Sequence, residues 1–492
     1  MLMCILLTHS QKNFSTSASL YTLGPASEFE TQNIGRQQAE GTVAKRRRRA
    51  DETLLEGFSP GYIRATPKSQ LTPVDVYMKN GMDRSVNQNA CRAAVKPGLA
   101  TPAALLLCGS LALFGGKAFA ANTPNTDQAT RMYNRIAGVP PSASILAQMT
   151  ATDPVNAALL ATQDPAFYNN TIRNLAAPWT NRDQSVFVPL NDYTATVVGM
   201  VRDDVPFNTL LSADLVYIAG SSATSAYSLP AYSPANNNLY QAMDDNNVDL
   251  SSKANLVSST QSALTGIPAA ATAGVMTTRG AASAFFINGT NRAMFRFTMM
   301  NHLCNDLQTV MDITRPPDLI RQDVARSPGG NSTLFLTNCV GCHAGMDPMA
   351  QAFAYYNFNN TDPTTASTTG QIVYTAGQVQ PKYHINNNNF PQGYSTPDDS
   401  WVNRWRSGPE AVLGWNTSLP ANGNGAKSLG QELEGSAAFA SCQVTRVFKD
   451  VCLRAPNSND FTQVAAMIAS FKAHNYSLRR VFAEGAAYCM GN

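Results

Sequence analysis

Histidine and charged residues are scarce in this sequence, and several common catalytic motifs do not occur in its larger part. Only five of the 492 residues are histidine, and charged residues make up 14%. From residue 121 onward there is no G-x-S-x-G, H-E-x-x-H or phosphate-binding P-loop motif. We therefore do not expect serine hydrolase, zinc protease or P-loop nucleotide chemistry, and few histidines remain for general-base catalysis.

A secretion signal is predicted near the N-terminus. The apolar run 102–115 (PAALLLCGSLALFG) follows scattered basic residues and is too short to span a bilayer. Residues 118–120 (Ala-Phe-Ala) then fit the small-x-small cleavage rule. We expect residues 82–120 to be a signal peptide cleaved near Ala120. The mature protein is accordingly expected in the periplasm, or secreted, or at the cell surface.

Removal of residues 1–120 would change the net charge of the chain from positive to negative. Residues 1–81 are rich in Ser, Gln and Thr without sustained apolar periodicity, and we interpret them as a non-structural extension. From residue 121 on, 22 Lys and Arg face 25 Asp and Glu, a net charge of −3, whereas the whole chain carries +3. No basic stripe remains to bind nucleic acid, and no apolar run is long enough for a transmembrane span.

The remaining chain is expected to be mainly α-helical with long irregular loops. Apolar residues at helical spacing predict most of the helices. The polar stretch 219–285 predicts loops and short strands, and 357–424 predicts a long irregular insertion. The expected helices follow Asp164-Pro165 and Asp192, cover 291–313 and 439–452, and begin at Phe461 and Leu478.

One short motif carries specific chemistry. Cys339, Cys342 and His343 form C-x-x-C-H, in which two thiols one helical turn apart reach the vinyl groups at one porphyrin edge. The adjacent imidazole then serves as the proximal iron ligand. A thioredoxin-like redox pair would need a βαβ frame, and a zinc site would need further ligands nearby. The motif therefore predicts one covalently attached haem c.

The neighbouring residues indicate how the motif is presented. Ser332 is expected to cap a helix that carries the motif, and Gly345 is expected to end it. Asp347-Pro348 then has the pattern that begins a second helix.

The segment 339–358 (CVGCHAGMDPMAQAFAYYNF) resembles the haem motif of a large family of secreted bacterial cytochrome-c-like proteins. In that family, C-x-x-C-H is followed by Met-Asp-Pro and an aromatic-rich helix. Residues 134–141 and 200–204 are similar to helical modules that those proteins carry upstream. The resemblance implies haem c and redox work outside the cytoplasm. It also implies a helical module over 121–325 and a cytochrome-c-like haem domain over 326–492.

The second axial ligand of the iron is left open by the sequence. His384 lies in a polar loop long enough to fold over a haem, and it is our candidate distal ligand. Met346 and Met349 follow His343 closely and are expected on its own side of the haem. More distant candidates are His302, His474 and Met467, of which Met467 fits an apolar helix face better. An iron with an open position is the other alternative.

Four further cysteines follow residue 120: Cys304, Cys442, Cys452 and Cys489. In an oxidising compartment they predict up to two disulfides, although buried free thiols are the alternative. Cys442 and Cys452 lie on one predicted helix, and ten helical residues rise about 15 Å. A disulfide needs Cα atoms within roughly 7 Å, so each of the two should pair with Cys304 or Cys489 instead.

Three functions fit these features. A mono-haem electron-transfer protein with a redox partner protein is the first hypothesis. The second is a haem enzyme of peroxidase or oxidase type with an open distal side, because a simple electron carrier needs fewer residues to shield one haem. The third is a surface or assembly protein whose haem is structural.

Overall fold

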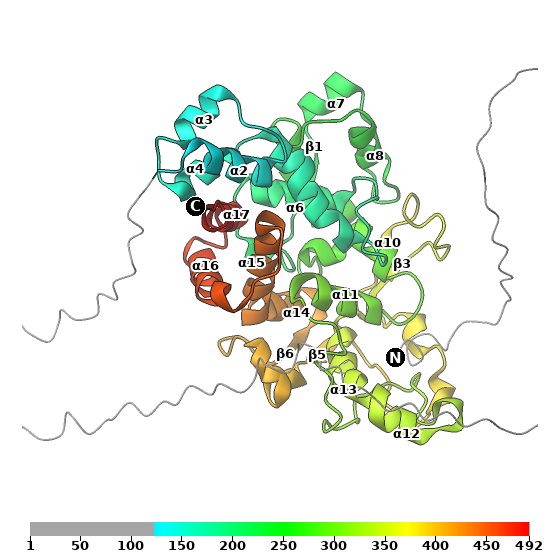
Figure 1. The fold of residues 1–492 in the computed structure, drawn as a ribbon. Helices are drawn as coiled ribbons and strands as arrows, with labels where there is room; N and C mark the ends of the chain where they lie inside the picture. Colours follow the sequence, from blue (N-terminus) through cyan, green and yellow to red (C-terminus); the bar gives the residue numbers. More distant parts are fainter. Residues whose placement is uncertain (1–122, 492) are drawn as a thin grey trace, which may run out of the picture. The chain divides into compact units, whose positions relative to one another are not determined.

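The computed structural model describes residues 123–491, and the predicted extension and signal peptide lie outside them (Figure 1). Helices dominate these residues, which confirms the mainly α prediction. No helix among them is long and apolar enough to cross a bilayer.

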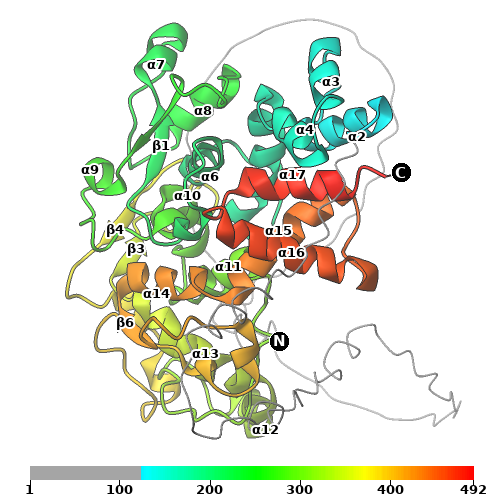
Figure 2. The ribbon, with the colours of Figure 1, turned by 90° about the vertical axis from the view of Figure 1, so that its left-hand side faces the viewer.

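The helices that frame the core begin and end at residues suited to those positions. α2 begins at a capping box formed by Asn125 and Gln128 and ends at Gly138 in the left-handed conformation. The C-terminal α17 packs on α4 and α15, so the two ends of the described chain meet. In both views α12 and α13 lie at the opposite end from α2, α3 and α4 (Figures 1 and 2).

The helices are α2 (Thr126–Ala137), α3 (Ala143–Met149), α4 (Pro154–Ala161), α5 (Arg173–Ala176), α6 (Asp192–Arg202), α7 (Ser221–Tyr227), α8 (Asn238–Asp245), α9 (Gln261–Thr265), α10 (Arg279–Phe285), α11 (Arg292–His302), α12 (Ser332–Leu334), α13 (Val340–Ala350), α14 (Gly425–Glu434), α15 (Ala437–Cys452), α16 (Phe461–Ala473) and α17 (Leu478–Tyr488).

The strands are short and pair only in twos. Within residues 123–491 they form three two-stranded antiparallel sheets. Each sheet supports a connection between helices instead of forming a layer of its own. The pairs are β1 (Val216–Ala219) with β2 (Leu256–Ser259), β3 (Tyr356–Phe358) with β4 (Ile372–Tyr374), and β5 (Ser400–Val402) with β6 (Asn422–Asn424).

Several helices agree with the sequence. The helix after Asp192 is α6, and the three C-terminal helices are α15, α16 and α17. The segment after Asp164-Pro165 is helical too, but its first part, Phe167–Ile172, is a π-helix. The stretch 357–424 is irregular, as expected, with short strands and 3-10 turns. Among these helices, α6, α15 and α17 begin at side-chain N-caps, a start signal that can be recognised in the sequence.

Two expectations were wrong. The stretch 219–285 contains β2, as the expected short strands require, but it also holds four helices that were not expected, α7, α8, α9 and α10. These helices are short, and their small residues have little apolar periodicity. The helix expected over 291–313 is α11 and ends at His302. Cys304 adopts a positive φ of 56° and is tied by a disulfide to Cys442, which turns the chain away from the helix axis.

Two disulfides join pairs of residues within the described part of the chain. Cys304 bonds Cys442, and Cys452 bonds Cys489, with Cα separations of 5.3 and 5.4 Å. Cys442 and Cys452 do lie on one helix, α15, and each pairs elsewhere. The expectation that these two do not pair with each other is confirmed.

The main apolar core extends through most of the described chain. It contains buried residues of α2 and α6 together with residues of α13, α15 and α17. These residues also belong to one compact unit. The core does not divide at residues 325 and 326, so the boundary between a helical module and a haem domain stays a prediction.

A buried carboxyl in this core predicts a pH-dependent stability. Glu434 accepts a hydrogen bond from the Leu211 amide at 2.8 Å and is hydrogen-bonded to Ser212. Burial raises its pKa from 4.5 to about 8. Between these values the folded protein binds a proton that the unfolded chain has lost, so stability falls as pH rises.

We expect Glu434→Gln to remove this pH dependence. Its amide keeps both hydrogen bonds without a charge, so the variant should be more stable than the parent at pH 8, by on the order of 2–5 kcal/mol. Urea unfolding at pH 5 and pH 8 measures this. An equal loss of stability between the two pH values in variant and parent would contradict the prediction.

Candidate functional site

The C-x-x-C-H motif lies on one continuous helical segment. It runs from Ser332 through α12, a π-helix (Phe335–Cys339) and α13 to Ala350. Asn331, not Ser332, provides the N-cap, by accepting from the Leu334 amide at 3.2 Å. The expectation of two helices was therefore wrong.

The reasons lie in tertiary contacts. Gly345 does not end the helix but allows a close approach, because a Cβ there would lie 1.9 Å from Nε1 of the buried Trp405. Asp347 does not cap a new helix, since its carboxylate is used by other side chains. Pro348 is accommodated inside α13.

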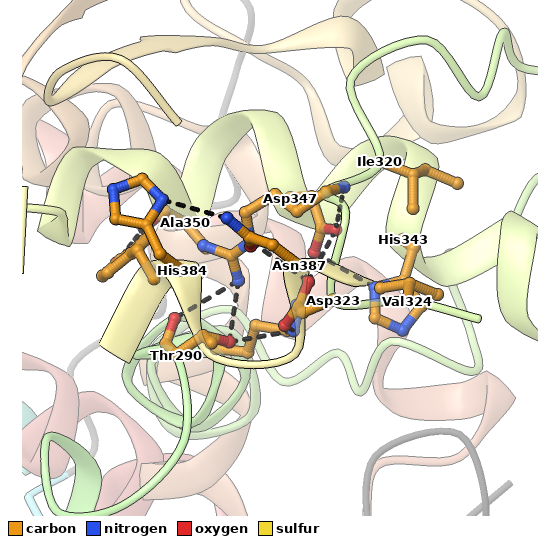
Figure 3. A network of polar contacts seen from close by, with 12 residues as sticks. Thr290, Ile320, Asp323, Val324, His343, Asp347, Ala350, His384 and Asn387 are labelled. Atoms are coloured by element: carbon orange, nitrogen blue, oxygen red, sulfur yellow. Dashed lines mark hydrogen bonds and ion pairs between the residues drawn. The ribbon is translucent and has the colours of Figure 1, made fainter. Parts of the chain in front are cut away.

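The imidazole of His343 is oriented by a carboxylate. Its Nδ1 lies 3.1 Å from Oδ1 of Asp347, four residues later on the same helical face (Figure 3). An ionised carboxylate only accepts hydrogen bonds, so Nδ1 carries the hydrogen in this contact. In the neutral imidazole, Nε2 therefore presents its lone pair. Nε2 is buried and has no hydrogen-bond partner among the described residues.

Asp347 is held in place by a buried ionic network. Arg292, the first residue of α11, donates to both of its oxygens at 2.6 and 2.9 Å and to both oxygens of Asp323 at 2.7 and 2.9 Å. The Arg321 amide adds a further contact to Asp347 at 3.3 Å. Burial opposes ionisation of Asp347, but Arg292 and His343 hold its pKa well below the usual range. Asp347 is therefore a fixed, charged acceptor for the imidazole.

A small apolar cluster surrounds the other side of the imidazole. Cys339, Val340 and Ala344 share it with buried side chains of the preceding segment, and Figure 3 shows Ile320 and Val324 beside His343. Arg326 stabilises the turn around these two residues by donating hydrogen bonds to the carbonyls of Val324 and Ile320, at 2.7 and 3.0 Å. The remaining member of the cluster is Phe335.

The two cysteines of the motif lie on different faces of the segment. Cys339 belongs to this small cluster, whereas Cys342 belongs to the main core. Cys342 is a free, buried thiol whose Sγ lies 3.4 Å from the Leu307 carbonyl. Burial raises its pKa to about 12, so the sulfur is a neutral thiol.

His384 lies away from the His343 imidazole. It ends the 3-10 helix Pro381–His384, is exposed, and has its Nδ1 3.3 Å from the Asn387 amide nitrogen. The neighbouring Tyr383 donates to the Ala350 carbonyl, which is about 10 Å along α13 from His343. In Figure 3 the ionic network separates the two imidazoles. The structure does not bring them together, and His384 as distal ligand stays a prediction.

The other candidate ligands lie in ordinary structural positions. Met346, Met349 and Met467 are fully buried in the main core. His302 is buried and hydrogen-bonded to the Tyr193 hydroxyl at 2.7 Å, and burial lowers its pKa to about 3. His474 is exposed beside Ser470.

Asp347 and its partners are the site residues that sequence reasoning missed. The available signal was the i, i+4 spacing of His343 and Asp347, which places both on one face of any helix. Arg292 and Asp323 had no such signal, since they lie far away along the chain.

The residues present fit a haem iron ligand. The donor is a buried, unpartnered Nε2 whose tautomer is set by its second nitrogen, as metal-bound imidazoles require. Free metal ions need several donors, and no group of three His, Cys, Asp or Glu is suitably placed within residues 123–491. A porphyrin supplies four donors itself, so a single imidazole suffices. Comparisons with protein-family models, curated proteins and solved structures find no match to this chain.

Proposed function

We propose that this protein is an exported mono-haem c-type cytochrome that transfers electrons outside the cytoplasm. The observation that carries the proposal is the buried His343 Nε2, which has no hydrogen-bond partner within residues 123–491, on a C-x-x-C-H helix. Cys342, and Cys339 once a thiol reductant has opened the disulfide that it makes in this structure, would hold the haem covalently, and His343 would ligate its iron. The haem supplies a one-electron couple, and a redox partner protein delivers or receives the electron.

The chain's own residues orient the ligand and exclude water. Asp347 sets the imidazole tautomer, and the apolar residues Ile320 and Val324 provide the low-polarity surroundings that a porphyrin face needs.

The disulfides support a location outside the cytoplasm. Cys304–Cys442 and Cys452–Cys489 are stable in an oxidising compartment, which is also where bacterial haem c attachment takes place. The localisation follows from this proposal together with the predicted signal peptide.

A haem enzyme of peroxidase or oxidase type is the second candidate. The placement of His384 favours it, because His384 lies apart from His343 in this structure, and an iron without a second protein ligand leaves one position for peroxide or a gas. In that case His343 remains the only protein ligand of the iron.

Visible spectra decide between these functions. The protein is produced with the haem c attachment machinery and recorded oxidised and reduced, with and without carbon monoxide. A sharp low-spin reduced spectrum that carbon monoxide leaves unchanged indicates two strong axial ligands and electron transfer. A spectrum that shifts with carbon monoxide indicates an open position and the enzyme. Protein without covalent haem would overturn both.

A further inference from the structure

The contact between His343 and Asp347 is stronger than a typical helix pair. Both side chains are nearly inaccessible, with 3% and 0% exposure. A charged acceptor in low-dielectric surroundings polarises the donor more than a backbone carbonyl does. The imidazole therefore gains negative charge, which makes Nε2 a better electron donor.

The partners of Asp347 keep its charge in place. Arg292 holds both carboxylates, so Asp347 cannot rotate away from the imidazole without breaking two hydrogen bonds. The charges of Arg292 and Arg321 balance those of Asp323 and Asp347. Of these four side chains, Asp347 is the one that contacts the imidazole, and Arg292 binds the same carboxylate.

We propose that Asp347 is a positioning residue for the iron ligand, one that strengthens donation from His343 and lowers the reduction potential of the haem. This inference rests on the proposed haem function. Oxidised iron carries one more positive charge than reduced iron, so a more negative ligand stabilises the oxidised state. The transfer involves one electron, exchanged with the partner protein, and no proton.

If Asp347 had a purely structural role, its replacement would affect stability but not the reduction potential of the haem. If the carboxylate only pairs with Arg292 to hold α11 against α13, its loss changes stability and leaves the iron unaffected. Reduction potential therefore separates the two roles, whereas stability does not.

The test compares haem-loaded variants by spectroelectrochemical titration. Asp347→Asn keeps an oxygen for Nδ1–H but removes the charge, so the potential should rise above that of the parent. Asp323→Asn is the matched control, because it removes the same charge from the same arginine without contacting His343. It should shift the potential in the same direction but less.

Several outcomes would overturn the inference. One is a potential that Asp347→Asn leaves unchanged, and another is an equal shift in both variants, which would indicate distant charge alone. If Asp347→Asn does not fold, a wholly unchanged potential in Asp323→Asn still overturns the inference, because it contradicts an electrostatic effect of this network. Parent protein without covalent haem would instead reject the proposed function.

If the ferrous iron has an open sixth position, resonance Raman spectra provide a second measurement. The iron–imidazole stretch reports the donor strength of the ligand directly, and weaker donation in Asp347→Asn should lower its frequency. An unchanged stretch with a changed potential would show that Asp347 does not act through His343.

Discussion

Replacing Cys339 and Cys342 together with serine should abolish covalent haem. Serine hydroxyls do not form the thioether bonds that link a porphyrin to the chain, and His343 alone holds haem only reversibly. After denaturing electrophoresis, haem peroxidase staining at the mass of the protein should disappear completely. Mass spectrometry should show the loss of one haem. Each single variant should retain one thioether bond.

The matched control for this experiment is the Cys452→Ser, Cys489→Ser variant. It also removes two sulfurs, but from a disulfide at the far end of the described chain. Its covalent haem should persist even where its stability falls. Haem staining that survives in the Cys339→Ser, Cys342→Ser variant would reject the assignment of the motif.

The second large effect is expected at Arg292. Replacing it with methionine leaves Asp347 and Asp323 buried without their shared cation, with side-chain exposures of 0% and 8%. Breaking a buried pair by removing one partner typically costs about 3–5 kcal/mol. We expect a loss of that order in the free energy of unfolding, measured by urea denaturation at pH 7.

Arg296→Met is the control for Arg292→Met. Arg296 lies one turn later on α11 and pairs with Asp306, but both side chains are about a third exposed, at 31% and 27%. Pairs of this kind contribute about 1 kcal/mol or less. Equal losses in the two variants would show that the ionic network around Asp347 is not a buried structural element.

Local patterns were enough to predict a large part of the helical framework. α15 and α17 begin at serine N-caps and have buried apolar faces, and the rise of α15 excluded a bond between Cys442 and Cys452. The end of α11 was not predictable in this way. Its apolar stripe continues beyond His302, but Cys304 leaves the helix to meet Cys442, a partner 138 residues away.

The helix around the C-x-x-C-H motif is also a case in which the local sequence pattern and the tertiary contacts differ. The sequence around Gly345 and Asp347-Pro348 has the pattern of a helix end followed by a new start. In the fold, Trp405 packs against Gly345 and Arg292 binds the Asp347 carboxylate, so both residues serve a continuous helix. Local propensity was outweighed by contacts that form only after distant segments meet.

By itself, the sequence determined the mainly helical class, the candidate haem motif at Cys339, Cys342 and His343, and the exclusion of one disulfide. These depend on residues close together along the chain. Only the tertiary structure decided that His343 is oriented by a charged Asp347 and lies apart from His384. Those relations depend on Arg292 and Asp323, which reach the site from other segments and are stable there because burial removes competing water.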